Sequence, residues 1–149
     1  MDEYKKAKTI FCFIGGELEV DTMPLIEKAL CSGKKVAVPL CVSKGVMEAR
    51  LITELSRLSK GRYKIMEPSL DSPVVSPKEI DFGVIPCVSC NEKGERLGHG
   101  GGYYDRFMQD TDFFKALICF SCLMTDKIPV EEHDIAVDAV IHEEKIIIL

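Results

Sequence analysis

Short apolar runs alternate along this chain with segments of helical spacing, and this alternation constrains the fold more than any other feature. The runs Thr9–Ile14 and Lys34–Cys41 are typical of buried strands. Between them, Asp21 and Thr22 can cap a helix, and Gly33 stands where that helix should end. Strand, helix and strand together have the size of one βαβ unit.

The second half of the chain continues the pattern. We predict strands at Ile80–Pro86 and Lys115–Cys122, a helix at Tyr103–Gln109, and a terminal hairpin formed by Val137–His142 and Lys145–Leu149. Strands that alternate with helices favour a mostly parallel sheet with helices on both faces. We therefore predict a three-layer α/β/α fold, in which ligands bind beyond the carboxyl ends of the strands.

Three segments have less distinctive patterns. Pro39 is expected to mark the end of its strand, and the residues from Pro68 to Pro77 have the composition of a loop. Met47–Ile52 could form a strand and Thr53–Leu58 a short helix. With 149 residues, the chain is expected to form a single domain, residues 1–149.

Charge and composition narrow the choice of partners. A formal net charge of −5 argues against nucleic acid or an anionic membrane as the main partner. No apolar run approaches the ~18 residues of a membrane span, and the N-terminus lacks a signal-peptide pattern. Seven cysteines, mostly within apolar runs, suggest reduced thiols. We therefore expect a cytoplasmic protein that is a monomer or a weak homodimer.

The segment Arg96–Arg106 carries most of the chemical information. Four of the five residues 98–102 are glycine, which allows positive φ and close approach of the backbone to a ligand. Successive backbone N–H groups in such a loop, followed by a helix start, favour an anion. Arg96 and Arg106 can grip phosphate or carboxylate, and Asp105 suits Mg²⁺. Tyr103 and Tyr104 offer flat faces for a ring.

Two common phosphate-binding motifs do not fit this segment. A Walker loop would need Gly-Lys-Ser/Thr, which does not follow. A Rossmann fingerprint would need a third glycine where Tyr103 stands. A flexible glycine hinge between a strand and a helix is the simplest alternative.

The same segment closely resembles the signature of the 5-formyltetrahydrofolate cyclo-ligase family, also called methenyltetrahydrofolate synthetases. Weaker similarity extends from about Ile10 to Glu143, and it runs through Glu19–Thr22, Gly33–Pro39, Glu67-Pro68, Asp81–Pro86 and the stretch from Ile128 to Asp138. The resemblance implies a fold related to sugar-phosphate isomerases and CoA transferases. It also implies MgATP-dependent conversion of 5-formyltetrahydrofolate, a reduced folate, to 5,10-methenyltetrahydrofolate.

The resemblance assigns roles to individual residues. The positions that match the family's ATP site are Arg96, Leu97, Gly98, His99, Gly100, Gly101, Gly102, Tyr103 and Tyr104. Those that match its folate side are Ile14, Glu19, His99, Gly100, Gly101, Gly102 and Tyr103. Asp105 and Asp134 match the acids of the Mg²⁺ site. We expect Arg96, Tyr103 and Arg106 to take part in catalysis.

The chain departs from the family pattern before its first strand. Family members usually begin with a helix whose lysine and arginine contact ATP, and Lys5, Lys6 and Lys8 do not match those positions. A family member that binds nucleotide or folate without turnover is therefore a second hypothesis.

The cysteines support a third hypothesis, a metal or redox protein. Cys87 and Cys90 form one CxxC pair, and Cys119 and Cys122 form another. If their strands are neighbours, all four sulfurs could meet. Residues i and i+3 of an extended strand face opposite sides, however, which argues against a zinc site. His133 and His142 are expected to be structural or surface residues.

Overall fold

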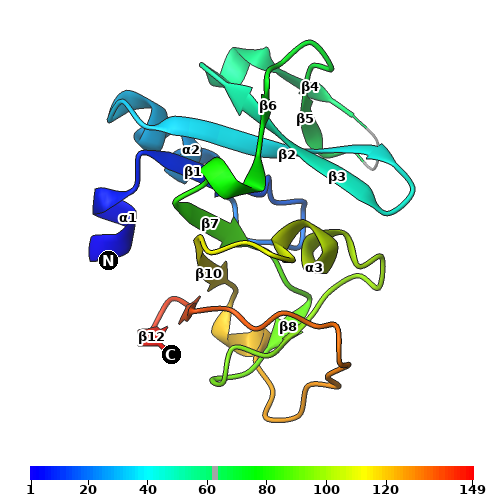
Figure 1. Ribbon diagram of the computed structural model, residues 1–149. Helices are drawn as coiled ribbons and strands as arrows, with labels where there is room; N and C mark the ends of the chain where they lie inside the picture. The colour runs from blue at the N-terminus through cyan, green and yellow to red at the C-terminus, as the bar shows by residue number, and fades with distance from the viewer. Residues whose placement is uncertain (62–63) are drawn as a thin grey trace.

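An eight-stranded sheet forms the centre of the molecule in this computed structural model, which describes residues 1–61 and 64–149 (Figure 1). Its strand order is β12-β11-β10-β7-β1-β2-β3-β6. The strands are β1 Thr9–Cys12, β2 Lys35–Ser43, β3 Val46–Ile52, β6 Val74–Val75, β7 Phe82–Ile85, β10 Phe114–Ile118, β11 Ala139–Ile141 and β12 Ile146–Ile148.

The middle of the sheet is parallel and its edges are antiparallel. β2, β1, β7, β10 and β11 run in the same direction, whereas β3 pairs antiparallel with β2 and β12 pairs antiparallel with β11. The predicted mostly parallel sheet and the predicted terminal hairpin are both confirmed.

Short helices cover both faces of the sheet. They are α1 Asp2–Lys6, α2 Met23–Cys31 and α3 Tyr103–Met108, with 3₁₀ turns η1 Leu55–Arg57, η3 Pro77–Glu79 and η4 Ser121–Leu123. Two small sheets, β4 Leu58–Lys60 with β5 Met66–Pro68 and β8 Ser89–Cys90 with β9 Arg96–Leu97, flank the main one. The α/β class is confirmed, although the helical layers are thin.

The alternation of side chains along β1 divides the core between the two faces. Ile10 points to the face covered by α2, where it shares an apolar cluster with Ile26. Phe11 points to the opposite face and packs against Phe107 of α3, with 4.7 Å between ring centroids. All of these side chains are buried, so the sheet holds α3 and the glycine-rich loop before it in a fixed position.

Three predicted boundaries were wrong. β2 continues through Pro39 to Ser43, because its pairing with β1 ends at Ala37 whereas its pairing with β3 continues through Pro39. β10 stops at Ile118 and does not reach Cys122, since the 3₁₀ turn η4 intervenes. The short helix predicted at Thr53–Leu58 is only the 3₁₀ turn η1.

The start of α2 also differs from the prediction. Thr22 is the N-cap residue, but its hydroxyl donates to the carbonyl of Phe13 at 2.6 Å and accepts from the Gly15 N–H. The Asp21 carboxylate instead accepts the N–H of Met23 at 3.0 Å. Thr22 therefore ties the helix to the chain that leaves β1, where the functional cavity begins.

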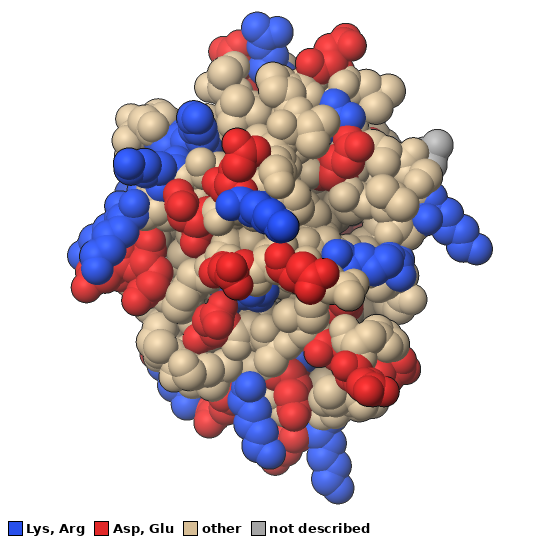
Figure 2. All heavy atoms as spheres, viewed as in Figure 1, with Lys and Arg blue, Asp and Glu red and all other residues tan. Residues whose placement is uncertain are grey.

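The surface carries both signs of charge. On the face shown in Figure 2, acidic and basic side chains are interspersed rather than gathered by sign. None of the helices in the described part of the chain has the length and apolar character that crossing a bilayer demands.

Candidate active site

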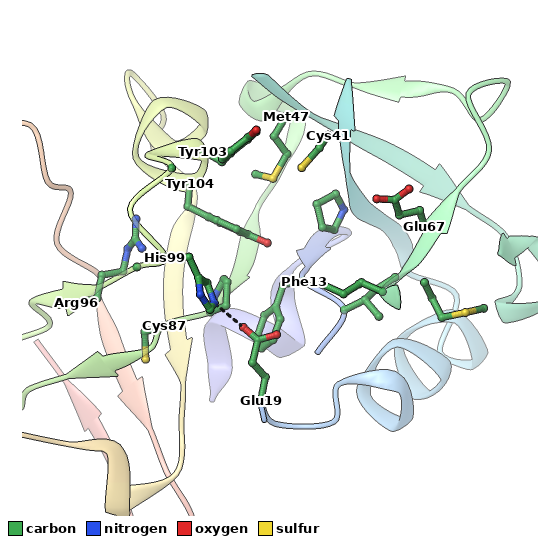
Figure 3. A pocket seen from close by; sticks show the side chains of 17 residues that line it. Phe13, Glu19, Cys41, Met47, Glu67, Cys87, Arg96, His99, Tyr103 and Tyr104 are labelled. Carbon is green, nitrogen blue, oxygen red and sulfur yellow. Dashed lines mark ion pairs between the residues drawn. The ribbon is translucent and has the colours of Figure 1, made fainter. Parts of the chain in front are cut away.

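A cavity of about 210 Å³ lies beyond the carboxyl ends of the parallel strands (Figure 3). Phe13 and Ile14, which follow β1, and Pro86 and Cys87, which follow β7, form part of its wall. β1 and β7 are parallel neighbours, so these residues meet at the same edge of the sheet. This is the position that the predicted topology assigns to a ligand.

The glycine-rich loop forms one side of this cavity. It runs from β9 to α3, and its last residue, Gly102, has φ 63° and ψ 16°, a left-handed conformation. A Cβ atom at Gly102 would lie 2.8 Å from Nη1 of Arg106. The left-handed backbone is therefore the reason for glycine at this position, and the helix begins at Tyr103 as predicted.

A buried ion pair anchors the loop. Nη2 of Arg96 donates to Oδ1 of Asp105 at 2.6 Å, and the two side chains are 4% and 17% exposed. The same Oδ1 accepts the backbone N–H of Ile135 at 3.2 Å. Asp105 thus joins β9, α3 and the segment before β11.

The side chain of Arg96 also lines the cavity, and one of its N–H groups has no hydrogen bond among the described residues. Its Nε is buried and has no hydrogen-bond partner among the described residues. A buried polar group without a partner is costly, so this nitrogen is a natural donor to a bound anion.

An exposed ion pair borders the same loop. Nε2 of His99 lies 3.6 Å from Oε1 of Glu19, drawn as a dashed line in Figure 3, and the side chain of His99 is 75% exposed. The other carboxylate oxygen of Glu19 accepts the N–H of Gly16 at 2.8 Å. Glu19 is therefore held in place by backbone, whereas His99 is held mainly by one weak contact.

Tyr103 and Tyr104 both line the cavity. The hydroxyl of Tyr104 points into the cavity in Figure 3, and burial together with the nearby Glu19 carboxylate raises the pKa of this phenol. Tyr104 therefore stays protonated at neutral pH and can donate a hydrogen bond to a ligand.

Arg106 lies outside the cavity wall. Its Nε donates to the carbonyl of Gly45 at 2.8 Å, Nη2 donates to the carbonyl of Gly101, and the guanidinium lies 5.8 Å from the ring centroid of Tyr103. Arg106 thus links the glycine-rich loop to the turn between β2 and β3.

The carboxylate of Asp105 contacts the backbone next to Asp134, the other predicted metal-site acid. Asp105 accepts the N–H of Ile135, the residue that follows Asp134. Oδ2 of Asp134 accepts the N–H of Glu131 at 2.8 Å. Both contacts of Asp105 use Oδ1, so among the described residues its Oδ2 has no bonding partner.

Several predicted site residues line the cavity: Ile14, Glu19, Arg96, Gly98, His99, Gly101, Tyr103 and Tyr104. Others do not form its wall: Leu97, Gly100, Gly102, Asp105, Arg106 and Asp134. The structure thus brings eight of the predicted residues together at one end of the sheet.

The prediction missed the wall opposite the loop. Met47 on β3 and Ile65, Met66 and Glu67 around β5 line the cavity together with Cys41 of β2. Similarity at Gly33–Pro39 and at Glu67-Pro68 was the sequence signal near this wall, and Pro39 also lines the cavity. The cavity is therefore polar on the loop side and largely apolar on the other.

Three cysteines gather beside the cavity. The sulfurs of Cys87, Cys90 and Cys119 lie within 4.8 Å of one another. Hydrogen bonding among them lowers the pKa of Cys90 and raises the pKa of Cys87. Cys122 is exposed, so the expectation that four sulfurs could meet was wrong. The argument that Cys87 and Cys90 would face opposite sides was also wrong, because β7 ends at Ile85 and the chain turns before β8.

Comparison with known proteins agrees with this geometry. A profile of the 5-formyltetrahydrofolate cyclo-ligase family matches residues 1–143. The 5-formyltetrahydrofolate cyclo-ligase of Escherichia coli K12 is 37% identical over 146 residues, which cover 94% of this chain and 80% of that protein. A probable 5-formyltetrahydrofolate cyclo-ligase of Schizosaccharomyces pombe is 31% identical over 164 residues, 99% of this chain and 80% of the relative.

Solved structures show the same likeness. The 5,10-methenyltetrahydrofolate synthetase of Aquifex aeolicus superposes with a TM-score of 0.85 at 29% identity, over 99% of this chain and 75% of that one. Sheet, glycine-rich loop and sequence similarity over nearly the whole chain lead to the same assignment. This chain belongs to the 5-formyltetrahydrofolate cyclo-ligase family of ligases.

Proposed function

We propose that this protein converts 5-formyltetrahydrofolate to 5,10-methenyltetrahydrofolate at the expense of MgATP. The γ-phosphoryl group of ATP passes to the formyl oxygen and ADP leaves. Nitrogen-10 of the folate then attacks the formyl carbon and loses its proton, and the C–O bond breaks to release inorganic phosphate, which takes up that proton. The oxygen of the formyl group therefore departs with the phosphate, and a ring closes between the two nitrogens.

The observation that carries the proposal is the state of Arg96. Its guanidinium is buried on the cavity wall, its Nη2 is fixed by Asp105, and its Nε lacks a partner among the described residues. A fixed cation with a spare donor, next to a loop of glycine backbone, suits the phosphates of ATP. Such sites stabilise charge that develops in the transition state.

The opposite wall suits the flat, partly apolar ring of a reduced folate. Phe13, Ile14, Met47 and Met66 supply apolar contacts. The Glu19 carboxylate, held by the Gly16 N–H, can accept hydrogen bonds from ring nitrogens. The two walls would thus bring the formyl oxygen and the terminal phosphate together.

The residues present fit a magnesium ion. Asp105 and Asp134 provide the hard oxygen ligands that Mg²⁺ prefers, and Oδ2 of Asp105 is open among the described residues. When bound with ATP, Mg²⁺ supplies neutralisation of phosphate charge.

The remaining chemistry is positioning. Phosphoryl transfer of this kind needs orientation and charge stabilisation rather than a side-chain nucleophile. Arg96 orients phosphate, the loop backbone approaches it closely, and the protonated hydroxyl of Tyr104 donates to a ligand atom in the cavity. Tyr103 is kept in place by the Arg106 guanidinium over its ring.

The test is a turnover assay in which formation of the methenyl product is followed by its near-ultraviolet absorbance. We expect product only when 5-formyltetrahydrofolate, ATP and Mg²⁺ are all present, with one ADP formed per product. Folded protein that forms no product at high enzyme concentration would overturn the proposal. Calorimetric binding of MgATP or folate without turnover would identify a binding module instead.

Light scattering of the same sample checks the expected monomer or weak homodimer, and fractionation of the source cells checks the expected cytoplasmic location.

A further inference from the structure

The three-cysteine cluster of Cys87, Cys90 and Cys119 lies beside the proposed active site and has no part in the proposed reaction. The three side chains are buried, with 8%, 0% and 4% of their surfaces exposed. They come from three elements: the end of β7, the strand β8 and the end of β10. A cluster assembled from separate parts of the chain depends on the fold rather than on local sequence.

The spacing of the sulfurs suits a single metal ion. Zn–S bonds are about 2.3 Å, so two thiolates of a tetrahedral site lie about 3.8 Å apart. Here Sγ of Cys90 and Sγ of Cys119 are 3.3 Å apart, and all three sulfurs fall within 4.8 Å of one another. Shifts of a few tenths of an ångström up to about 1 Å would bring the sulfurs into such a triangle.

The arrangement favours a metal over a disulfide. A disulfide would join two of the sulfurs at about 2.05 Å and leave the third as a thiol. A thiophilic ion uses all three. Cys87 also lies on the wall of the cavity, with its sulfur turned away from Arg96 in Figure 3, so the cavity gives an ion and a water ligand a path to the cluster.

His142 lies next to the sulfurs. Ile118 and Ile141 are the last paired residues of β10 and β11, and the N–H of Cys119 donates to the carbonyl of Ile141. The next residues, Cys119 and His142, therefore lie opposite each other and on the same face of the sheet. Nε2 of His142 is buried and has no hydrogen-bond partner among the described residues. Three thiolates and one divalent ion would together carry one negative charge, and an imidazole N–H beside them can offset it.

We propose that Cys87, Cys90 and Cys119 bind one thiophilic divalent ion, Zn²⁺ in the first instance, as thiolates. The site lies beside Arg96, because Cys90 pairs directly with Arg96 in the β8–β9 hairpin. A bound ion would join β7, β8 and β10 and brace the base of the glycine-rich loop.

The experiment is a titration of the full chain, purified with a reductant and stripped by a chelator, with Zn²⁺ in competition with a chromophoric chelator. We expect one equivalent bound per chain, and Co²⁺ in its place should show thiolate charge-transfer absorption. Binding of less than a tenth of an equivalent would overturn the proposal. So would a Cys90–Cys119 disulfide in the untreated protein with no metal uptake after reduction.

Variants identify the ligands. Cys90→Ser should weaken Zn²⁺ binding by more than about 100-fold, beyond the 10–100-fold cost of losing an outer partner. Cys12→Ser is the matched control, since Cys12 is equally buried but lies outside the cluster, and Cys122→Ser tests the other half of its CxxC pair. Both should bind as the parent does, and a loss in either as large as in Cys90→Ser would contradict the assignment.

Two further measurements separate binding from folding. Circular dichroism establishes that Cys90→Ser is folded, and Cys119→Ala gives an independent variant should it not be. Zn²⁺ should raise the thermal midpoint of the parent and of Cys12→Ser but not of a folded cluster variant. His142→Gln should bind about tenfold more weakly, and unchanged affinity would remove His142 from the site.

Discussion

Two pairs of facing side chains flank the glycine-rich loop, and they differ in burial and in charge, because arginine is always charged whereas histidine is charged only when it is protonated. At the base of the loop, Arg96 and Asp105 are 2.6 Å apart, with side chains 4% and 17% exposed. At its outer side, His99 and Glu19 are 3.6 Å apart, and His99 is 75% exposed. Loss of one partner from a buried pair leaves an uncompensated charge, whereas an exposed pair contributes about 0–1 kcal/mol. The buried Arg96–Asp105 pair should therefore stabilise the site, whereas the His99–Glu19 pair should affect only the affinity for a ligand.

Replacement of Arg96 should have the largest effect, a loss of catalytic efficiency. Arg96→Met keeps an unbranched, uncharged stem in place of the longer arginine and removes the donors to phosphate. We expect kcat/KM to fall roughly 10²–10³-fold, the typical cost of losing one donor to developing charge. Initial rates of methenyl product formation measure it. A fall of less than tenfold in folded protein would show that Arg96 does not contact the reacting phosphate.

The buried pair itself is tested by stability. Asp105→Asn leaves the Arg96 charge without its partner and should lower the free energy of unfolding by about 3 kcal/mol. Chemical denaturation is measured for the parent, for Arg96→Met, for Asp105→Asn and for the double variant, which completes a double-mutant cycle. Additive effects would contradict the view that the two side chains act as a unit.

Arg106 should have an intermediate effect, because it positions the loop without lining the cavity. Arg106→Lys keeps the charge, but a lysine cannot reach the carbonyls of Gly45 and Gly101 with the same fork. Loss of one such hydrogen bond, about 1.5 kcal/mol, predicts a roughly tenfold fall in kcat/KM. Arg57→Lys, at an exposed ion pair outside the site, is the control and should be neutral.

The outer pair should show the smallest effect. His99→Gln is expected to change the free energy of unfolding by less than about 1 kcal/mol and the KM for folate by less than about fivefold. Thermal denaturation and steady-state kinetics measure the two quantities. An effect as large as that of Asp105→Asn would remove the distinction between the base and the outer side of the loop.

The strands and the loop were predictable because their signals are local. Short apolar runs identified β1, β7 and the terminal hairpin, and the glycines of residues 98–102 identified a backbone that can approach a ligand. The end of β2 was missed because Pro39 lies past the last residue paired with β1 while β3 goes on pairing with this strand, which only the sheet reveals.

The apolar wall of the cavity had almost no local signal. Met47 and Met66 belong to β3 and β5, and their patterns are those of ordinary buried residues. They face the glycine-rich loop only because the β2–β3 hairpin folds over it, where Arg106 holds the Gly45 turn. Contacts between segments so far apart along the chain depend on the path of the whole backbone.

The sequence by itself determined the mostly parallel sheet, the edge at which a ligand binds, and a glycine-rich loop suited to phosphate, because strand periodicity and glycine conformation act over a few residues. Only the tertiary structure decided that Arg96 is fixed by Asp105, that Arg106 faces the hairpin, and that three of the four CxxC sulfurs meet while Cys122 stays exposed. Those outcomes depend on where strands end and how the chain turns after them, and packing across the sheet settles both.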